Sequence, residues 1–348
     1  MNYFFPSYIT SPKVKATAPP DFIHTVNSGK NALRLALRNL QLPSQSKVAI
    51  PAYTCIAVNE AVREENLEPV LFDMHSATSY WTNYDSEKLL KENIKAIVLV
   101  HLYGFIHPDT EVLTNFCLAN NIKLVHDAAQ SYGINENILM KGNGIIYSFG
   151  PGKSLTAAGG GWIKGITNEF YSKNVKFNSS SLLSNIYSEL FLKTRIYGYT
   201  FIFSDKIKSF INARLKYSTK EITSMSNFAK QVNSYSLLIQ NDMASARKRN
   251  YSTLKEAVST NKKIKIPYDD NKGQYFKLIP FVENDVEDFK NYLLKNNIPH
   301  FALFKPEYTK NSSLANFQKN GHNFIDISCE ASIPPEEINR IADLLKNY

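Results

Sequence analysis

Two neighbouring stretches of the chain decide the fold: KLVHDAAQSYG (residues 123–133) and GIIYSFGPGKSLTAAGGGWIKG (residues 144–165). The first contains an apolar run that ends at Asp127, and such a run is typical of a buried strand. The second contains another apolar run, followed by Lys153 between Gly152 and a tail of small residues. A lysine in a tight, glycine-bounded turn at a strand end is poorly placed for solvation. Such an amine is well placed to form a Schiff base with an aldehyde.

Enzymes that use pyridoxal phosphate need such a lysine, together with a carboxylate that faces the pyridinium nitrogen of the cofactor. Asp127 can supply this carboxylate, because an ionised aspartate keeps the ring nitrogen protonated. The pattern therefore predicts a pyridoxal phosphate site in which Lys153 and Asp127 are the catalytic residues. In the alternative interpretation, Asp127 caps a helix, Gln130 is a surface residue and Lys153 is an ordinary loop cation.

These stretches also resemble a known family, the DegT–StrS sugar aminotransferases, which are pyridoxal phosphate enzymes of fold type I. HDAAQSYG resembles the family's (E)DAAQ(A/S)xG segment, and SFGPGKSLTAAGGGW resembles its SFxxxK…GG segment. In that family the Asp contacts the pyridine nitrogen, the Gln lies near the phenolic oxygen, the Ser binds the phosphate and the Lys forms the Schiff base. The resemblance implies these roles for Asp127, Gln130, Ser148 and Lys153.

A third segment, SGKNALRLAL (residues 28–37), resembles the SGTxAL segment with which the family binds the cofactor phosphate. The free N–H groups and the dipole at a helix N-terminus favour an anion there. The resemblance implies that Gly29 allows close approach and that Lys30 and Asn31 supply amides. Lys30 replaces the family's Thr, so its ammonium group is expected either to pair with the phosphate or to point to solvent.

Several positions depart from the family pattern. IPAYTCIAVN (residues 50–59) resembles a segment in which an aromatic residue stacks on the pyridine ring, but this chain has Cys55 there. Either Cys55 contacts the ring as a small apolar group, or another aromatic residue takes this role. His101, at a predicted strand end, either lies close to the site or, as the simpler expectation, is structural. The family's GxNxRM segment, through which the neighbouring subunit helps hold the phosphate, keeps only Met225.

Around these motifs, near-continuous apolar strands alternate with helices, which predicts an α/β domain with a mostly parallel sheet covered by helices. The resemblance implies the aspartate aminotransferase-like arrangement, with a large domain over residues 1–240 and a small α+β domain over residues 241–348. Residues 1–27 are expected to be irregular, and residues 168–224 to be divergent and partly helical. The aromatic core of this divergent region, YGYTFIF (residues 197–203), is expected to be buried, to cover a dimer interface or to touch a membrane surface. The remaining elements are expected as strands at residues 48–52, 69–73, 96–103 and 275–282 and helices at residues 56–66, 85–92, 109–120, 226–257 and 287–296.

Composition limits the other classes of function. The net charge of +9 over 348 residues would suit a nucleic-acid binder, but the lysines are scattered and no nucleic-acid motif is recognisable. An anionic substrate such as a nucleotide diphosphate is the simpler expectation. The three cysteines are too far apart for a disulfide framework or a metal cluster, so a reducing cytoplasm and no metal are expected. Neither a signal peptide nor a membrane span is recognisable.

The resemblance implies an aminotransferase that moves an amino group from an amino acid, by family likeness glutamate, to a nucleotide-linked keto sugar. Such a reaction serves surface polysaccharide or amino-sugar biosynthesis, and a homodimer is expected. One alternative is a degenerate member that only binds the cofactor or a sugar nucleotide. Another is a sugar dehydratase that uses the same cofactor, although that branch carries a His in place of the lysine, so Lys153 argues against it.

Overall fold

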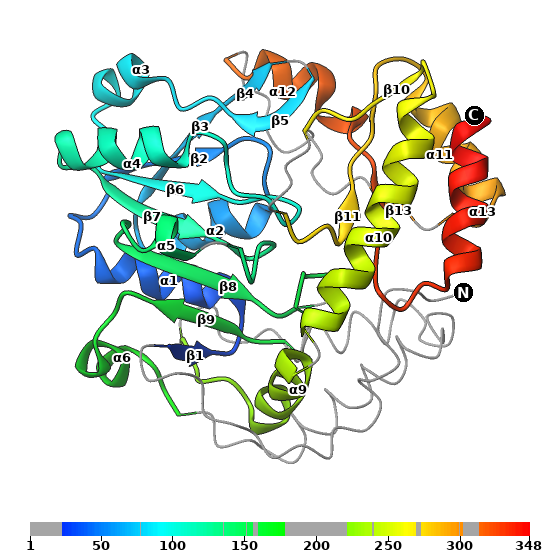
Figure 1. Cartoon of the computed structure of the whole chain (residues 1–348). Helices are drawn as coiled ribbons and strands as arrows, with labels where there is room; N and C mark the ends of the chain where they lie inside the picture. Colours follow the sequence, from blue (N-terminus) through cyan, green and yellow to red (C-terminus); the bar gives the residue numbers. More distant parts are fainter. Residues whose placement is uncertain are drawn as a thin grey trace, which may run out of the picture.

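The computed structural model describes residues 23–76, 78–134, 136–150, 152–155, 159–177, 221–238, 240–268, 273–298, 300–301 and 313–348. One part of the molecule is a large sheet with helices packed on it. The other part consists of the long helix α10, small sheets and the C-terminal helix (Figure 1). The YGYTFIF core of the divergent region lies outside the described residues.

Within the described residues, the central sheet has seven strands in the order β3, β2, β6, β7, β8, β9, β1. The strands from β3 to β8 run parallel, whereas β9 pairs antiparallel with both β8 and β1. The predicted α/β class with a mostly parallel sheet is therefore confirmed, with an antiparallel edge added. The strands are β1 (His24–Val26), β2 (Lys47–Pro51), β3 (Glu68–Phe72), β6 (Ala96–Val100), β7 (Lys123–Asp127), β8 (Gly144–Ser148) and β9 (Gly161–Lys164).

Helix α1 (Gly29–Asn39) packs its apolar face on β8 and β9, with Leu33, Leu35 and Ala36 buried. The 3.6-residue period places such residues on one side of a helix, which is why the sequence predicted this element. The connections between the other strands are largely helical, as the pattern indicated. The helices of this part are α2 (Ile56–Glu64), α3 (Ser86–Lys91), α4 (Thr110–Ala119), α5 (Glu136–Leu139) and α6 (Asn168–Asn174).

The C-terminal part is built around α10 (Gln240–Ser259), which follows α9 (Asn227–Leu238) and packs along α13 (Pro335–Lys346). Pro335 begins α13, and Glu336 and Glu337 lie in its first turn, where the helix dipole favours negative charge. The division of the chain at residue 240 stays a prediction. The remaining elements are β4 (Met74–Ser76), β5 (Ser79–Thr82), β10 (Ile264–Lys265), β11 (Lys277–Leu278), β12 (Phe281–Val282), α11 (Val286–Lys295), β13 (His300–Phe301), α12 (Ala315–Asn320), η3 (Gly321–Asn323) and β14 (Asp326–Ser328).

Four expected elements differ from the structure. The single helix expected over residues 226–257 is two helices, α9 and α10. The strand expected over 275–282 is two short strands in different sheets, because Pro280 between them has no N–H to continue a ladder. The strand expected over 96–103 ends at Val100, since Tyr103 adopts a left-handed conformation with φ of 57°. Residues 24–26, expected to be irregular, form β1 by pairing with β9.

Candidate active site

A cradle for an anion lies where helix α1 begins beside the end of strand β8. Ser28 caps the helix, and its Oγ accepts a hydrogen bond from the Asn31 N–H at 3.2 Å. A Cβ added to Gly29 would lie 2.6 Å from the Ser148 Oγ, and one added to Gly161 would lie 2.7 Å from the Ser28 carbonyl oxygen. Backbone and hydroxyl groups therefore approach one another closely at a helix N-terminus, an arrangement that suits a phosphate.

Lys153 lies in the turn between β8 and β9. Gly152, just before it, has φ of 75°, and a Cβ there would meet no atom within 4 Å, so open space adjoins the lysine. The residue is partly exposed, yet burial of its ammonium group is the main cause that lowers its pKa. Cys55 and the Asp127 carboxylate oppose this shift, and Lys277 adds to it, so all three groups lie near enough to influence the charge of the amine. A partly exposed amine with a lowered pKa can act as a nucleophile.

Asp127 is the last residue of β7, at the carboxyl edge of the parallel sheet, where ligands bind in such folds. It is 5% exposed, and its Oδ1 accepts a hydrogen bond from the Ala129 N–H at 2.9 Å. Burial raises its pKa, while the Ala129 N–H and the nearby Lys153 lower it. A buried carboxylate in this setting gains from a further cationic partner, and a protonated ring nitrogen is such a partner.

Gln130 follows β7 on the same edge. Its Oε1 accepts a hydrogen bond from the Tyr103 N–H at 2.8 Å, and the Tyr103 hydroxyl lies 2.7 Å from that of Tyr53. Tyr103, whose φ is 57°, thus gives its backbone N–H to the glutamine. The role of Gln130 near the phenolic oxygen of the cofactor stays a prediction.

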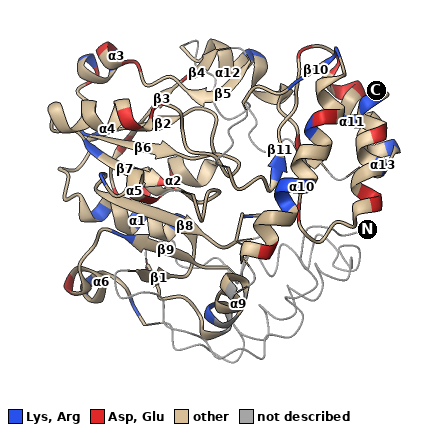
Figure 2. Ribbon diagram, viewed as in Figure 1, with Lys and Arg blue, Asp and Glu red and all other residues tan. Residues whose placement is uncertain are grey.

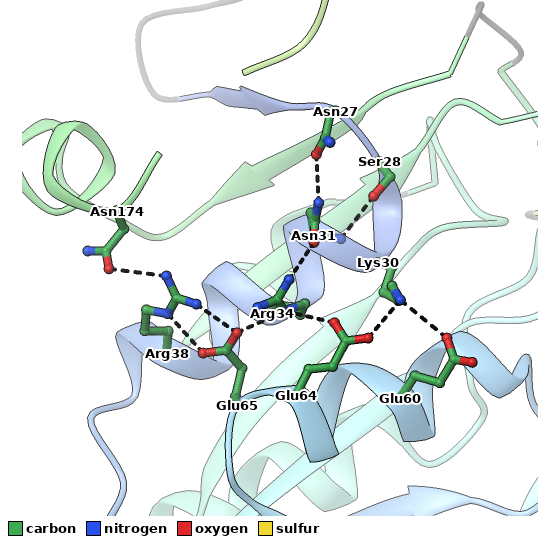
Figure 3. A network of polar contacts seen from close by, with 10 residues as sticks. All are labelled: Asn27, Ser28, Lys30, Asn31, Arg34, Arg38, Glu60, Glu64, Glu65 and Asn174. Carbon is green, nitrogen blue, oxygen red and sulfur yellow. Dashed lines mark hydrogen bonds and ion pairs between the residues drawn. The ribbon is translucent and has the colours of Figure 1, made fainter. Parts of the chain in front are cut away.

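The Lys30 side chain pairs with α2 and not with the anion cradle. Its Nζ lies 2.9 Å from Glu64 and 3.3 Å from Glu60. Figure 3 shows both carboxylates turned toward the Lys30 side chain. The pairing of Lys30 with a phosphate stays a prediction, and its side chain is not free in solvent. The physical reason is that two carboxylates on the adjacent helix compensate the cation. The contribution of the Lys30 backbone amide to a phosphate site stays a prediction.

The Asn31 side chain is held in the same network. Its Nδ2 donates to the Asn27 Oδ1 at 2.7 Å, and its Oδ1 accepts from Arg34 at 3.1 Å (Figure 3). Arg34 in turn donates to Glu65 at 2.9 Å. The network fixes the first turns of α1 against α2, so the helix N-terminus that faces Ser148 is rigidly placed.

Cys55 immediately precedes α2 and is exposed, with a free thiol. The nearby Tyr53 is buried and packs edge-on against Phe324, with ring centroids 5.3 Å apart. Its hydroxyl is already paired with that of Tyr103. Tyr53 is therefore part of the core beneath the site, and the role of Cys55 toward the cofactor ring stays a prediction.

His101 is structural, as expected. It lies within a buried histidine cluster: its Nε2 is 3.1 Å from the His126 Nδ1, and its Nδ1 accepts from the His107 N–H at 3.0 Å. Because successive residues of a strand point to opposite faces, His126 lies on the face of the sheet away from Asp127. This cluster supports the sheet from behind the candidate site.

Two buried ion pairs near the lysine turn were missed from the sequence. Lys277 pairs with Asp326, and Arg247 pairs with Glu330 at 2.7 Å. A lysine within the apolar run YFKLIPFV (residues 275–282) was a signal for the first, because a cation in such a run needs a buried partner. Nothing local marked Arg247, which lies in a helix rich in charged residues.

The segment that retains Met225 lies beside the same chain's anion cradle. The Asn27 N–H donates to the Thr223 carbonyl at 2.9 Å, and a Cβ on Gly160 would lie 2.6 Å from the Met225 side chain. Met225, the residue that this segment shares with the family pattern, therefore packs close to the anion cradle of its own chain.

The donor set fits pyridoxal phosphate: an amine, a buried carboxylate and an anion cradle all lie at the carboxyl ends of β7 and β8. No group of three or more His, Cys, Asp or Glu side chains within the described residues could hold a metal ion. Among the helices that the structure describes, none is long and apolar enough to cross a bilayer. In the ribbon view of Figure 2, the Lys and Arg segments are interspersed with Asp and Glu segments.

Comparison with known proteins gives a match over nearly the whole chain. A model described as the DegT/DnrJ/EryC1/StrS aminotransferase family matches residues 20–346. GDP-perosamine synthase of Escherichia coli O157:H7 is 29% identical over 164 residues, which are 45% of this chain and 44% of that protein. The dTDP-3-amino-3,4,6-trideoxy-alpha-D-glucose transaminase of Streptomyces venezuelae is 35% identical over 140 residues, 39% of this chain and 36% of that protein. The chain thus matches less than half the length of these relatives.

A solved structure supports the fold. A DegT DnrJ EryC1 StrS aminotransferase from Brucella abortus superposes with a TM-score of 0.70 at 18% identity, covering 93% of this chain and 85% of that chain. This likeness establishes the architecture, and the expected aspartate aminotransferase-like fold class is confirmed.

Proposed function

Because the chain belongs to the DegT/DnrJ/EryC1/StrS aminotransferase family, we propose that it is a pyridoxal phosphate-dependent aminotransferase acting on a nucleotide-linked keto sugar. The observation that carries this proposal is the juxtaposition of Lys153 and Asp127. The charge of each of these two groups shifts the pKa of the other, and both groups lie where parallel strands end. Relatives named for GDP- and dTDP-linked amino sugars support the class of acceptor.

Different residues would hold the phosphate and the ring of the cofactor. The N–H groups at the start of α1, together with Ser148, would bind the phosphate. Asp127 would hold the proton of the pyridine nitrogen through its buried carboxylate. When bound, pyridoxal phosphate supplies an aldehyde and an electron sink for the carbon that carries the amino group.

Lys153 would hold the cofactor through its Nζ and, once the amino group of the donor has displaced that Nζ, would move the proton. Burial lowers the pKa of its Nζ, so a larger fraction is a neutral amine near pH 7 and can accept a proton from the substrate carbon. The same Nζ would then give the proton to the carbon on the cofactor side of the C–N bond. Asp127 favours the uptake of the proton, because its carboxylate raises the pKa of the nearby lysine and so stabilises the ammonium form.

The finer identity of the reaction is part of the same proposal. Glutamate is the amino donor, and the product serves surface polysaccharide or amino-sugar biosynthesis. The protein works in the cytoplasm as a homodimer. The three free cysteines are compatible with a reducing compartment.

A panel of keto sugar nucleotides carrying GDP, dTDP and UDP, each incubated with glutamate, tests the proposal. Mass spectrometry of the sugar nucleotide and an assay for 2-oxoglutarate measure the transfer. Lys153→Ala is expected to lower turnover by at least about 10²-fold. Lys141→Ala, an exposed lysine of the same part of the chain, is the matched control and keeps turnover.

The outcomes separate the alternatives. A change in the visible spectrum on adding glutamate, without transfer to any sugar, would refute the acceptor class alone. A bound cofactor whose spectrum does not respond to glutamate or to any other amino acid would favour a degenerate binding protein. Loss of water from the sugar without amino transfer would favour a dehydratase.

A further inference from the structure

Arg247 is buried beside the lysine turn without being part of the site described above. It lies on α10, is 3% exposed, and donates from Nη1 to the Ser154 carbonyl oxygen at 2.5 Å. Ser154 directly follows Lys153 in the chain. The guanidinium therefore contacts the backbone one residue beyond the amine that the proposed function requires.

The other side of the guanidinium is anchored in the C-terminal part of the chain. Its Nε and Nη2 donate to the Glu330 Oε2 at 3.1 and 2.7 Å. Glu330 is 7% exposed, and its carbonyl oxygen accepts from the Asn250 Nδ2, one turn along α10, at 2.9 Å. A rigid, planar guanidinium can hold a carboxylate and a carbonyl in fixed directions at once, which a lysine ammonium cannot.

The lysine turn itself needs such support. Gly152 has φ of 75° and Gly159 has φ of 100°, so glycines on both sides leave the backbone conformationally free. Against this freedom, Ser154 is held at two points: its Oγ accepts from the Tyr132 N–H at 3.1 Å, and its carbonyl accepts from Arg247. Tyr132 follows the Asp127 segment, so the two contacts fix the turn to both parts of the molecule.

We propose that Arg247 is a positioning residue that, braced by Glu330, holds the Ser154 carbonyl and so aims the Lys153 amine at its reacting carbon. This inference rests on the proposed function for its catalytic consequence, but the backbone contact is testable without it. Replacing the Arg247 guanidinium would leave the buried Ser154 carbonyl with a weaker hydrogen-bond donor, and the lysine turn could then move. A displacement of the amine by about 1 Å costs on the order of 10²-fold in turnover.

The test compares Arg247→Lys with Arg249→Lys, which changes an exposed arginine of the same helix in the same way. Hydrogen exchange is measured on the full chain, both with pyridoxal phosphate bound and after its removal. Arg247→Lys is expected to speed amide exchange in residues 152–155 by about tenfold or more, with little change in α13. Arg249→Lys is expected to leave exchange unchanged.

The second readout is steady-state kinetics with glutamate and the sugar accepted in the panel. Arg247→Lys is expected to lower kcat on the order of 10²-fold with KM nearly unchanged, because binding groups stay in place while the amine is misaimed. Glu330→Gln, which keeps the shape of the brace, is expected to give a smaller change in the same direction. It also provides a second variant should Arg247→Lys not fold.

Two results would overturn the proposal. Exchange in residues 152–155 that matches Arg249→Lys would show that Arg247 does not hold the turn. Faster exchange spread evenly over α10, α13 and the turn, with a parallel loss of thermal stability, would show a general role in stability. If no sugar is aminated, the proposed function fails, while the exchange experiment still decides whether Arg247 positions the turn.

Discussion

Gly29 at the start of α1 and Ser148 at the end of β8 leave no room for a side chain between them. A Cβ on Gly29 would lie 2.5 Å from the Ser148 Cβ, closer than real side chains approach. Two residues 119 positions apart in the sequence are thereby forced to share one small space. The close approach keeps backbone N–H groups and a hydroxyl accessible to an anion.

The first prediction is that Gly29→Ala weakens retention of pyridoxal phosphate about tenfold or more, because the added methyl group pushes Ser148 away from the helix N-terminus. Cofactor content after gel filtration and the dissociation constant measure this. Gly144→Ala is the matched control, since its Cβ would meet neighbours only at 3.5 Å or more. Equal cofactor retention in the two variants would contradict the cradle.

The second prediction concerns the buried pair of Lys277 and Asp326. Their side chains are 11% and 4% exposed, so Lys277→Met leaves a carboxylate buried without its cation. We expect a loss of about 3–5 kcal/mol in the free energy of unfolding, measured with urea. Lys265→Met breaks the exposed pair with Glu283 and is expected to change little. If both variants lost a similar free energy of unfolding, burial of the ion pair would not determine its contribution to stability.

The third prediction is a loss of stability in mild acid caused by the histidine cluster. Burial lowers the pKa of His126 to about 4 and of His107 to about 3, and lowers that of His101 as well. In the unfolded chain these groups have pKa values near ~6.5, so below that pH the unfolded state binds more protons. Their contribution is complete above pH ~6.5 and is lost progressively as pH falls toward 4.

Urea unfolding at several pH values between 7 and 4 measures this dependence. His126→Gln is expected to give a shallower fall in the free energy of unfolding than the parent chain. His300→Gln, which changes a histidine outside this cluster, serves as the control and should follow the parent. A slope in His126→Gln identical to that of the control would contradict the assignment.

Much of this architecture could be predicted because it depends on local pattern. The start of α1 follows from a capping Ser28, a permissive Gly29 and apolar residues at helical spacing. Asp127 could be placed at a strand end because an apolar run leads directly to it. Ser148 and Lys153 lie within one motif, so recognising the strand before them was enough to predict that both lie near its end.

The remaining contacts could not be predicted because their partners are distant in the chain. Lys30 meets carboxylates 30 and 34 residues away, and only the packing of α2 on α1 brings them together. Arg247 bonds to Ser154 and Glu330, which are 93 and 83 positions distant. The sequence shows Pro280, but it does not show that the strands on either side of this proline pair with different sheets.

Chemical labelling identifies the lysine that carries the cofactor. Borohydride reduces the double bond between a lysine nitrogen and the aldehyde carbon and leaves a stable link. Peptide mass spectrometry of the full chain, loaded with pyridoxal phosphate and reduced in this way, is expected to place the phosphopyridoxyl mass on Lys153. A label on Lys277 or any other lysine, or none on a chain saturated with the cofactor, would contradict the account.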